Sequence, residues 1–163
     1  KRQLEVMVYD VRFCSTLVSV IGGGEEMGIM VGEKIGSTKG QATIKPLPAV
    51  NGLLVMESVD IGSGTIAGAE VTVMATFSSS MRANGSWYGE CPNSGVLMAA
   101  DGVATGTYSA TGAPTADGGF TFRGIAYFET VAPSLSALNG GAFVFEYESN
   151  ADGQSTWDLW EWK

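Results

Sequence analysis

Apolar and polar residues alternate over short stretches along almost the whole chain, and glycine, proline, asparagine or aspartate separates the stretches. Such alternation is typical of β-strands, because successive side chains point to opposite faces of a strand. The predicted strands are 4–14, 17–21, 28–33, 40–45, 53–61, 70–78, 86–91, 95–100, 104–110, 120–130, 142–149 and 156–162. Short strands at nearly regular spacing predict an all-β protein, a single antiparallel β-barrel of about eight to ten strands.

Four dipeptides mark hairpin turns, namely Asn51-Gly52, Asn84-Gly85, Asp117-Gly118 and Asp152-Gly153. Asn or Asp followed by Gly readily adopts the positive φ angles that a short hairpin turn requires. One stretch departs from the strand pattern: residues 132–140 begin with Ala-Pro and end with Asn-Gly. Proline is tolerated in a first helical turn, and Asn-Gly ends a helix, so we expect one short helix that closes one end of the barrel.

The chain matches itself at an offset of about 66 residues. The coincident residues are Gly36 with Gly102, Gly40 with Gly106, Pro48 with Pro114, and Asn51-Gly52 with Asp117-Gly118. Two explanations are open, an internal duplication or a coincidence between two glycine-rich β segments. We favour duplication, with pseudo-repeat halves at about 28–91 and 95–162 within a single β-barrel domain that spans 1–163.

Composition and charge narrow the function classes. Apolar residues make up 45% of the 163 residues and charged residues 16%, which excludes a disordered acidic tail. The formal net charge is −8, and residues 46–162 carry twelve acids but only two cations. Such a surface repels phosphate and anionic headgroups, so we expect no nucleic acid and no membrane as partner.

The sequence also lacks the residues that several kinds of chemistry need. It has no histidine, which excludes Ser-His-Asp and Cys-His catalysis as well as histidine metal ligands. Its two cysteines, Cys14 and Cys91, have no CxxC spacing and are either small apolar residues or one long-range disulfide. We therefore expect no metal and no cofactor. Localisation is open: a cytoplasmic protein is favoured, and a processed secreted chain is the alternative, because the chain begins with Lys1.

The order of several segments resembles a known barrel family. Residues 36–44 (GSTKGQATI) precede Gly52-Leu53-Leu54, and 60–68 (DIGSGTIAG) and 74–77 (MATF) follow. This order is similar to the calycin-like β-barrels of the allene oxide cyclase type, which include bacterial spirotetronate cyclases. The resemblance covers roughly residues 36–112. It implies an antiparallel barrel that holds an apolar polyene or polyketide and folds it for cyclisation, and it assigns no catalytic residue by motif.

Two charged residues interrupt apolar strands at equivalent positions. Arg123 lies within 120–130, and Glu57 is its counterpart at the offset of about 66. A charge in apolar surroundings is costly unless it is paired. Either the two side chains share the lumen and orient a ligand, or they face outward or form a structural ion pair. Arg123 shares its strand face with Tyr127, whereas the opposite, aromatic face is more typical of a core. The candidate catalytic residues are Glu57, Arg123 and Tyr127.

The candidate ligand-binding residues are aromatic side chains and one methionine, namely Tyr88, Trp87, Met56, Phe122 and Trp157. Such side chains line cavities for flat or irregular apolar ligands, but they also fill cores and interfaces. Strands 53–61 and 120–130 are apolar on both faces, whereas a barrel strand normally has one polar face. We infer that the outside of the barrel is covered too, by another copy in a homo-oligomer.

Three functions are consistent with this sequence. The favoured one is a barrel that binds a small apolar molecule in its lumen. The second, implied by the resemblance, is a cofactor-independent cyclase or isomerase that works by restricting substrate conformations. The third is a structural oligomeric barrel with a filled core and no ligand. A binder is stabilised by its ligand, which separates it from a filled barrel.

Overall fold

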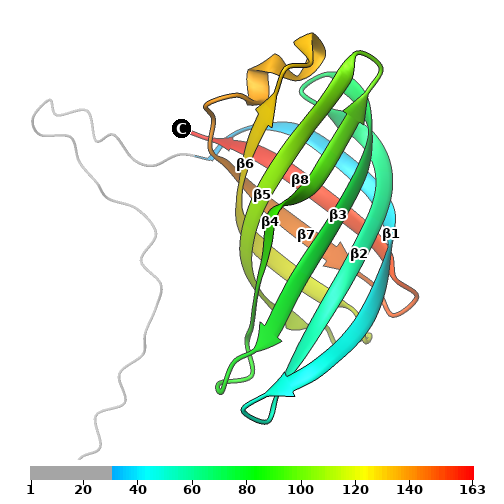
Figure 1. Cartoon of the computed structure of the whole chain (residues 1–163), viewed down its shortest axis with the longest axis vertical. Helices are drawn as coiled ribbons and strands as arrows, with labels where there is room; N and C mark the ends of the chain where they lie inside the picture. Colours follow the sequence, from blue (N-terminus) through cyan, green and yellow to red (C-terminus); the bar gives the residue numbers. More distant parts are fainter. Residues whose placement is uncertain (1–30) are drawn as a thin grey trace, which may run out of the picture.

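The computed structural model describes residues 31–163, which form one closed barrel of eight antiparallel strands. The strands follow one another around the barrel in chain order, and β8 pairs with β1 to close it (Figure 1). Their bounds are β1 Val31–Val50, β2 Leu53–Ile66, β3 Ala69–Met81, β4 Trp87–Ala99, β5 Gly102–Pro114, β6 Phe120–Thr130, β7 Phe143–Ser149 and β8 Gln154–Trp162. The predicted all-β class and single antiparallel β-barrel are confirmed, with eight as the number of strands.

Tight hairpins connect most neighbouring strands, and all four predicted turn dipeptides lie in such connections. Asn51 and Gly52 join β1 to β2 with φ angles of 52° and 77°, as a type I′ turn requires. The sequence analysis missed a second turn of this kind. Ala67 and Gly68 join β2 to β3 with φ angles of 51° and 82°, although alanine has no preference for positive φ.

Some predicted strands are parts of longer ones. The described part of 28–33 and the whole of 40–45 belong to β1, and 86–91 and 95–100 belong to β4. The β4–β5 register shifts between Cys91 and Gly95, because a bulge interrupts a strand without ending it. The boundary between the two predicted halves falls in this bulge. Duplication stays a prediction, and the predicted strands 4–14 and 17–21 lie outside the described residues.

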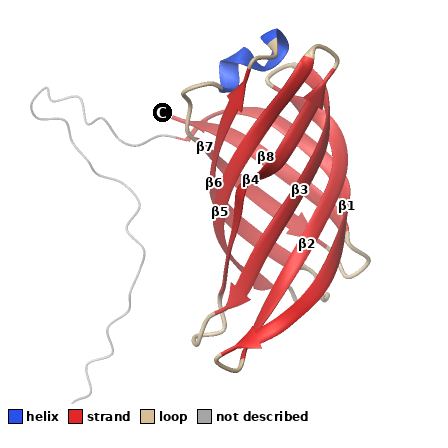
Figure 2. Ribbon diagram, viewed as in Figure 1, coloured by secondary structure: helices blue, strands red, loops and turns tan. Residues whose placement is uncertain are grey.

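The predicted short helix is the 3-10 helix η1, Pro133–Leu138, between β6 and β7. It lies at one end of the barrel (Figure 2) and contacts β5 and β6. Leu135 and Leu138 are fully buried and belong to the hydrophobic core. These two leucines explain why so short a helix is held at this end of the barrel.

Burial alternates along β6 and identifies the inner face of the barrel. Phe122, Ala126 and Phe128 are buried, whereas Arg123 and Tyr127 are exposed. The expectation that the aromatic face of this strand forms the core is therefore confirmed. Inward-pointing residues from all eight strands fill the interior, as in other small barrels.

The outer face carries apolar side chains as well. Ile61 lies opposite Met74 on β2 and β3, Met98 lies opposite Val103 on β4 and β5, and all four are exposed. A second copy that covers this face stays a prediction. Among residues 31–163, there is no helix with the length and apolarity that crossing a membrane would take.

Candidate functional site

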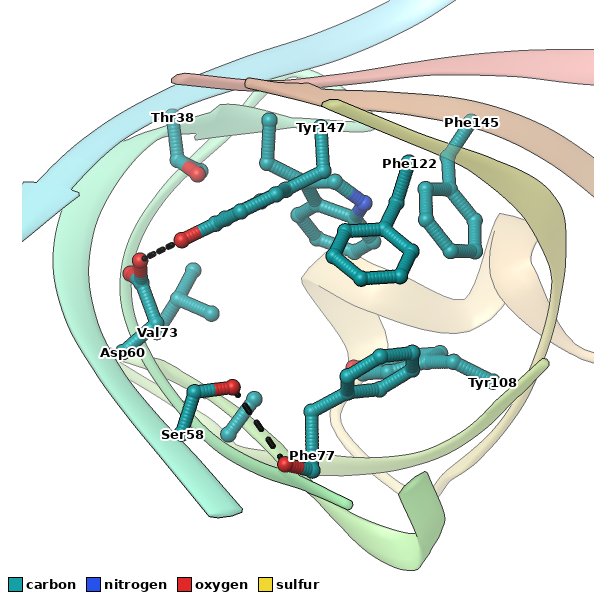
Figure 3. A pocket seen from close by; sticks show the side chains of 11 residues that line it. Thr38, Ser58, Asp60, Val73, Phe77, Tyr108, Phe122, Phe145 and Tyr147 are labelled. Atoms are coloured by element: carbon teal, nitrogen blue, oxygen red, sulfur yellow. Dashed lines mark hydrogen bonds between the residues drawn. The ribbon is translucent and has the colours of Figure 1, made fainter. Parts of the chain in front are cut away.

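A cavity of about 80 Å³ lies inside the barrel (Figure 3). The side chains that line it come from seven of the eight strands, all except β4. They are Thr38, Ser58, Asp60, Val73, Ala75, Phe77, Tyr108, Phe122, Phe145, Tyr147 and Trp157. Six of these eleven residues are aromatic, and a few carry polar groups. An apolar wall with a few convergent polar groups is typical of small-molecule sites.

The strand register explains why these side chains meet. Residues directly opposite each other on neighbouring strands point to the same face of a sheet. Phe122 lies opposite Tyr147, Tyr147 lies opposite Trp157, and Trp157 lies opposite Thr38. These four residues therefore form one continuous inner row across β6, β7, β8 and β1.

The Tyr108 ring occupies space that two glycines leave open. Gly95 and Gly106 lie opposite each other on β4 and β5, and a Cβ atom on either glycine would overlap the tyrosine side chain. On its other side, the ring packs against Phe145 and Trp157, with centroid distances of 6.1 and 5.4 Å. The side chain is therefore held between the barrel wall and the aromatic cluster.

The Tyr108 hydroxyl is a buried polar group without a partner. The residue is only 7% exposed, and its oxygen has no hydrogen-bond partner among residues 31–163. Figure 3 shows the Tyr108 side chain behind that of Phe77, and its oxygen lies over Gly95 and Gly106 of the barrel wall. Burial raises the pKa of the Tyr108 phenol, with a smaller contribution from Cys91, so the hydroxyl keeps its proton. A buried donor left without a partner costs about 1–3 kcal/mol, which a hydrogen-bonding ligand would recover.

A polar wall lies opposite the aromatic side chains. Asp60 is the one charged residue among those that line the cavity, and it accepts a hydrogen bond of 2.9 Å from the Tyr147 hydroxyl. Burial raises the pKa of Tyr147, and the charge on Asp60 raises it further, so Tyr147 remains the donor. Ser58 donates to the backbone carbonyl of Phe77 at 3.3 Å. Thr38 on β1 and Ser58 and Asp60 on β2 therefore form the polar side of the cavity (Figure 3).

Two of the predicted ligand-binding residues, Phe122 and Trp157, line this cavity. Trp87 is buried in another part of the interior, where its ring meets the edge of Phe120 with 5.6 Å between centroids. Met56 is partly buried and packs against the core without lining the cavity. The structure therefore gives these two residues packing contacts rather than a place in the cavity wall.

Tyr88, the fifth predicted ligand-binding residue, lies on the outside of the barrel. Its hydroxyl donates to Glu90, and the Arg82 guanidinium lies 4.6 Å from the centroid of its ring. Successive side chains of a strand point to opposite faces, and its neighbour Trp87 points inward. Tyr88 is therefore separated from the cavity by the barrel wall.

The three predicted catalytic residues also lie on the outer face. The Arg123 Nε atom is 2.8 Å from the Glu146 carboxylate in an exposed ion pair, and Tyr127 is 51% exposed. Glu57 follows Met56 and precedes Ser58, which point inward, so it points outward. On both strands the even-numbered residues face the lumen. Glu57 and Arg123 therefore do not share the lumen, and the ion-pair interpretation of Arg123 holds with Glu146 as its partner.

Sequence reasoning missed Asp60, Tyr108 and Tyr147, the residues that give the cavity its polar chemistry. Tyr108 does carry a signal that could have been used, because it is the one large residue on its strand face. The positions on both sides of it on that face are Ala104, Gly106, Ala110 and Gly112. These small residues leave room for the Tyr108 ring to lie over its own strand. Asp60 has no such signal, since the opposite face of its strand, with Val59 and Ile61, is the more apolar one.

Cys91 is fully buried on the inner face of β4, with its sulfur 3.2 Å from the Ser94 hydroxyl. Burial raises the pKa of this thiol. Cys14 lies outside the described residues, so both interpretations of the cysteine pair stay predictions. Within residues 31–163, no group of three or more cysteine, aspartate or glutamate side chains is arranged to hold a metal ion.

Neither a protein-family model nor a curated protein matches the sequence. Solved structures of at least two other proteins share the barrel fold. A conserved protein of unknown function from Rhodopseudomonas palustris has a TM-score of 0.68 at 13% identity, over 83% of this chain and 99% of that chain. A β-barrel-like protein from Acinetobacter baumannii has a TM-score of 0.67 at 12% identity, over 83% of this chain and 97% of that chain. At these identities the likeness shows the fold alone, and function has to be argued from the cavity.

Proposed function

We propose that this barrel binds a small, mainly apolar molecule in its lumen. The observation that carries the proposal is the cavity itself, which six aromatic residues line together with Ser58 and Asp60. The Tyr108 hydroxyl adds to it, because it is buried and has no partner among residues 31–163. In a filled structural core, phenylalanine at this position would avoid a cost of about 1–3 kcal/mol. A phenol kept at this cost beside an aromatic cavity favours ligand binding over a structural barrel without ligand.

The cavity volume limits the size of the ligand. At about 80 Å³, it is smaller than the cavity of about 150 Å³ that accepts benzene in an engineered protein core. A larger guest requires rings such as Phe77 and Phe122 to change rotamer. We therefore expect a compact cyclic or branched molecule rather than a long chain.

A cofactor-independent isomerase or cyclase is the second candidate, as the resemblance to the allene oxide cyclase type implies. The contact between Asp60 and Tyr147 favours it, because a carboxylate can accept a proton from a bound carbonyl compound and a phenol can donate one. Such a proton shift is redox-neutral and needs no cofactor. Conversion of the bound compound by the wild type, and its loss in Asp60→Asn with binding retained, would favour this candidate.

Native mass spectrometry of protein purified from its own host tests the binding proposal. We expect a co-purified small apolar molecule in the wild type and none in Ala75→Leu, because the larger side chain projects into the cavity from β3. The matched control Ala113→Leu makes the same change at an exposed position of β5 and should retain the molecule. An empty wild type whose Tm does not rise with toluene, phenol or cyclopentanone would contradict the proposal.

A further inference from the structure

The cavity wall carries one charge, and no lysine or arginine among residues 31–163 forms an ion pair with it. The residues that line the cavity include Asp60 but no lysine or arginine. The ion pairs within residues 31–163 join Lys34 to Asp158, Arg123 to Glu146 and Lys163 to Glu161, and none involves Asp60. The hydrogen bond from the neutral Tyr147 hydroxyl is the contact that this part of the chain supplies to the carboxylate.

A carboxylate in this position favours a cation beside it. Asp60 is partly buried, so its carboxylate loses part of its hydration to the apolar side chains, and one neutral hydrogen bond restores only part of that loss. An aromatic wall acts in the same direction wherever a ring turns its face to the cavity, because the negative face of a ring repels an anion and attracts a cation. Charge and ring chemistry therefore both favour a positively charged guest.

We propose that the ligand carries a protonated amine, which pairs with Asp60 while its apolar part lies against the aromatic wall. This inference rests on the proposed binding in the lumen. An ammonium group has three N–H donors. Ser58 uses its own proton on the Phe77 carbonyl, so its oxygen is free to accept one of them. Thr38 adds a second hydroxyl oxygen on the neighbouring strand.

Tyr108 adds a second recognition element on the far side of the cavity (Figure 3). Its hydroxyl is protonated and neutral, so it supplies a hydrogen bond but no charge. An amine with an oxygen atom at its other end would meet both Asp60 and Tyr108. The preference for an amine itself depends on Asp60 alone.

Isothermal titration calorimetry on the full chain at neutral pH tests this inference with matched compounds. Isobutylamine and benzylamine are compared with isobutanol and benzyl alcohol, which have the same shape without the charge, and with benzoate as the anion. We expect each amine to bind about tenfold more tightly than its alcohol, as a charge-assisted hydrogen bond allows, and benzoate not to bind.

Two variants locate the source of the preference. Asp60→Asn keeps the size of the side chain and should bring amine and alcohol to equal affinity. Glu57→Gln is the matched control, since it removes the same charge from the outer face of the same strand and should leave the preference unchanged. Circular dichroism and Tm establish that both variants fold.

The outcomes separate this inference from the binding proposal. Alcohols that bind the wild type as tightly as amines overturn the amine inference and leave lumen binding intact. A loss of preference in Glu57→Gln as large as in Asp60→Asn also overturns it, because the net charge of −8 would then be the cause. Failure of every compound to bind overturns both. The comparison within the wild type does not depend on how a variant folds.

Discussion

Replacing Tyr108 with phenylalanine removes one oxygen atom and keeps the ring, so it tests the chemistry of the cavity directly. In the empty barrel the hydroxyl is buried and has no partner among residues 31–163. The uncompensated desolvation of this hydroxyl costs about 1–3 kcal/mol, which the substitution removes. The substitution also leaves a small void where the oxygen was, and this void offsets part of the stabilisation. We expect Tyr108→Phe to stabilise the ligand-free protein by about 1–2 kcal/mol, or roughly 2–8 °C in Tm.

Two other tyrosines provide controls with different expected signs. Tyr147→Phe removes the donor to Asp60 and should lower the free energy of unfolding by about 1–3 kcal/mol. Tyr127→Phe changes a hydroxyl on the exposed outer face and should alter stability by no more than about 0.5 kcal/mol. If the effect came from removing any tyrosine hydroxyl, the change in stability would have the same sign at all three positions.

Urea denaturation and calorimetry of ligand-free protein measure these differences, with native mass spectrometry to verify that the barrel is empty. With a lumen ligand present, the sign at Tyr108 should reverse, because the wild-type hydroxyl then gains its partner. Loss of 1 kcal/mol or more in ligand-free Tyr108→Phe, the size of one hydrogen bond, would refute the reasoning. It would mean that the hydroxyl is already satisfied in the empty barrel.

Three further predictions follow from burial and charge. Burial raises the pKa of Tyr108 and Tyr147 in the folded protein, so folding is favoured fully below about pH 10 and less above it, where the unfolded phenols ionise. Between pH 8 and 11, the urea midpoint of Tyr108→Phe should therefore fall less steeply than that of the wild type. Cys91 is fully buried with a raised thiol pKa, so in a Cys14→Ser background Ellman's reagent should label it only after denaturation. Arg123→Gln breaks an exposed ion pair and should leave ligand affinity unchanged in calorimetry, and a large loss would return this residue to the site.

The fold could be predicted because its signals are local. Alternation of apolar and polar residues gives the strands, and the dipeptide at Asn51-Gly52 gives a turn whose φ angles the structure reproduces. The bulge at 91–95 could not be predicted in the same way, since it interrupts the alternation while pairing continues on both sides. The prediction therefore divided one long strand into two.

The site was harder to predict because alternation defines two faces of a strand without saying which one points inward. On β6 the aromatic face is clearly the more apolar, and Phe122 was assigned to the core correctly. On β2 the face of Val59 and Ile61 is more apolar than that of Ser58 and Asp60, yet the polar face lines the cavity. A shift of one residue exchanges the faces, so the sequence analysis selected Glu57, which lies on the outer face, rather than Asp60, which lines the cavity.

The glycines of the wall and the aromatic rings of the lumen are parts of one arrangement. A Cβ atom on Gly89 would overlap the ring of Phe77, and one on Gly106 would overlap the ring of Tyr108. An eight-stranded barrel has an interior only just wide enough for its own side chains. Rings such as Phe77 and Tyr108 therefore fit beside the cavity because the wall positions beneath them carry no side chain.

This packing weakens the matching glycines as evidence for an internal duplication. Gly106 makes room for Tyr108, whereas at its counterpart Gly40 a Cβ atom would meet the Asp60 carboxylate and the neighbouring backbone. The two glycines are thus required by different neighbours, and crowding inside the barrel is enough to explain why both positions lack a side chain. The matching turn dipeptide Asn51-Gly52 is constrained in another way, since its φ angles of 52° and 77° are those that a type I′ turn requires. Packing and turn geometry therefore explain these matches individually, and duplication stays a prediction.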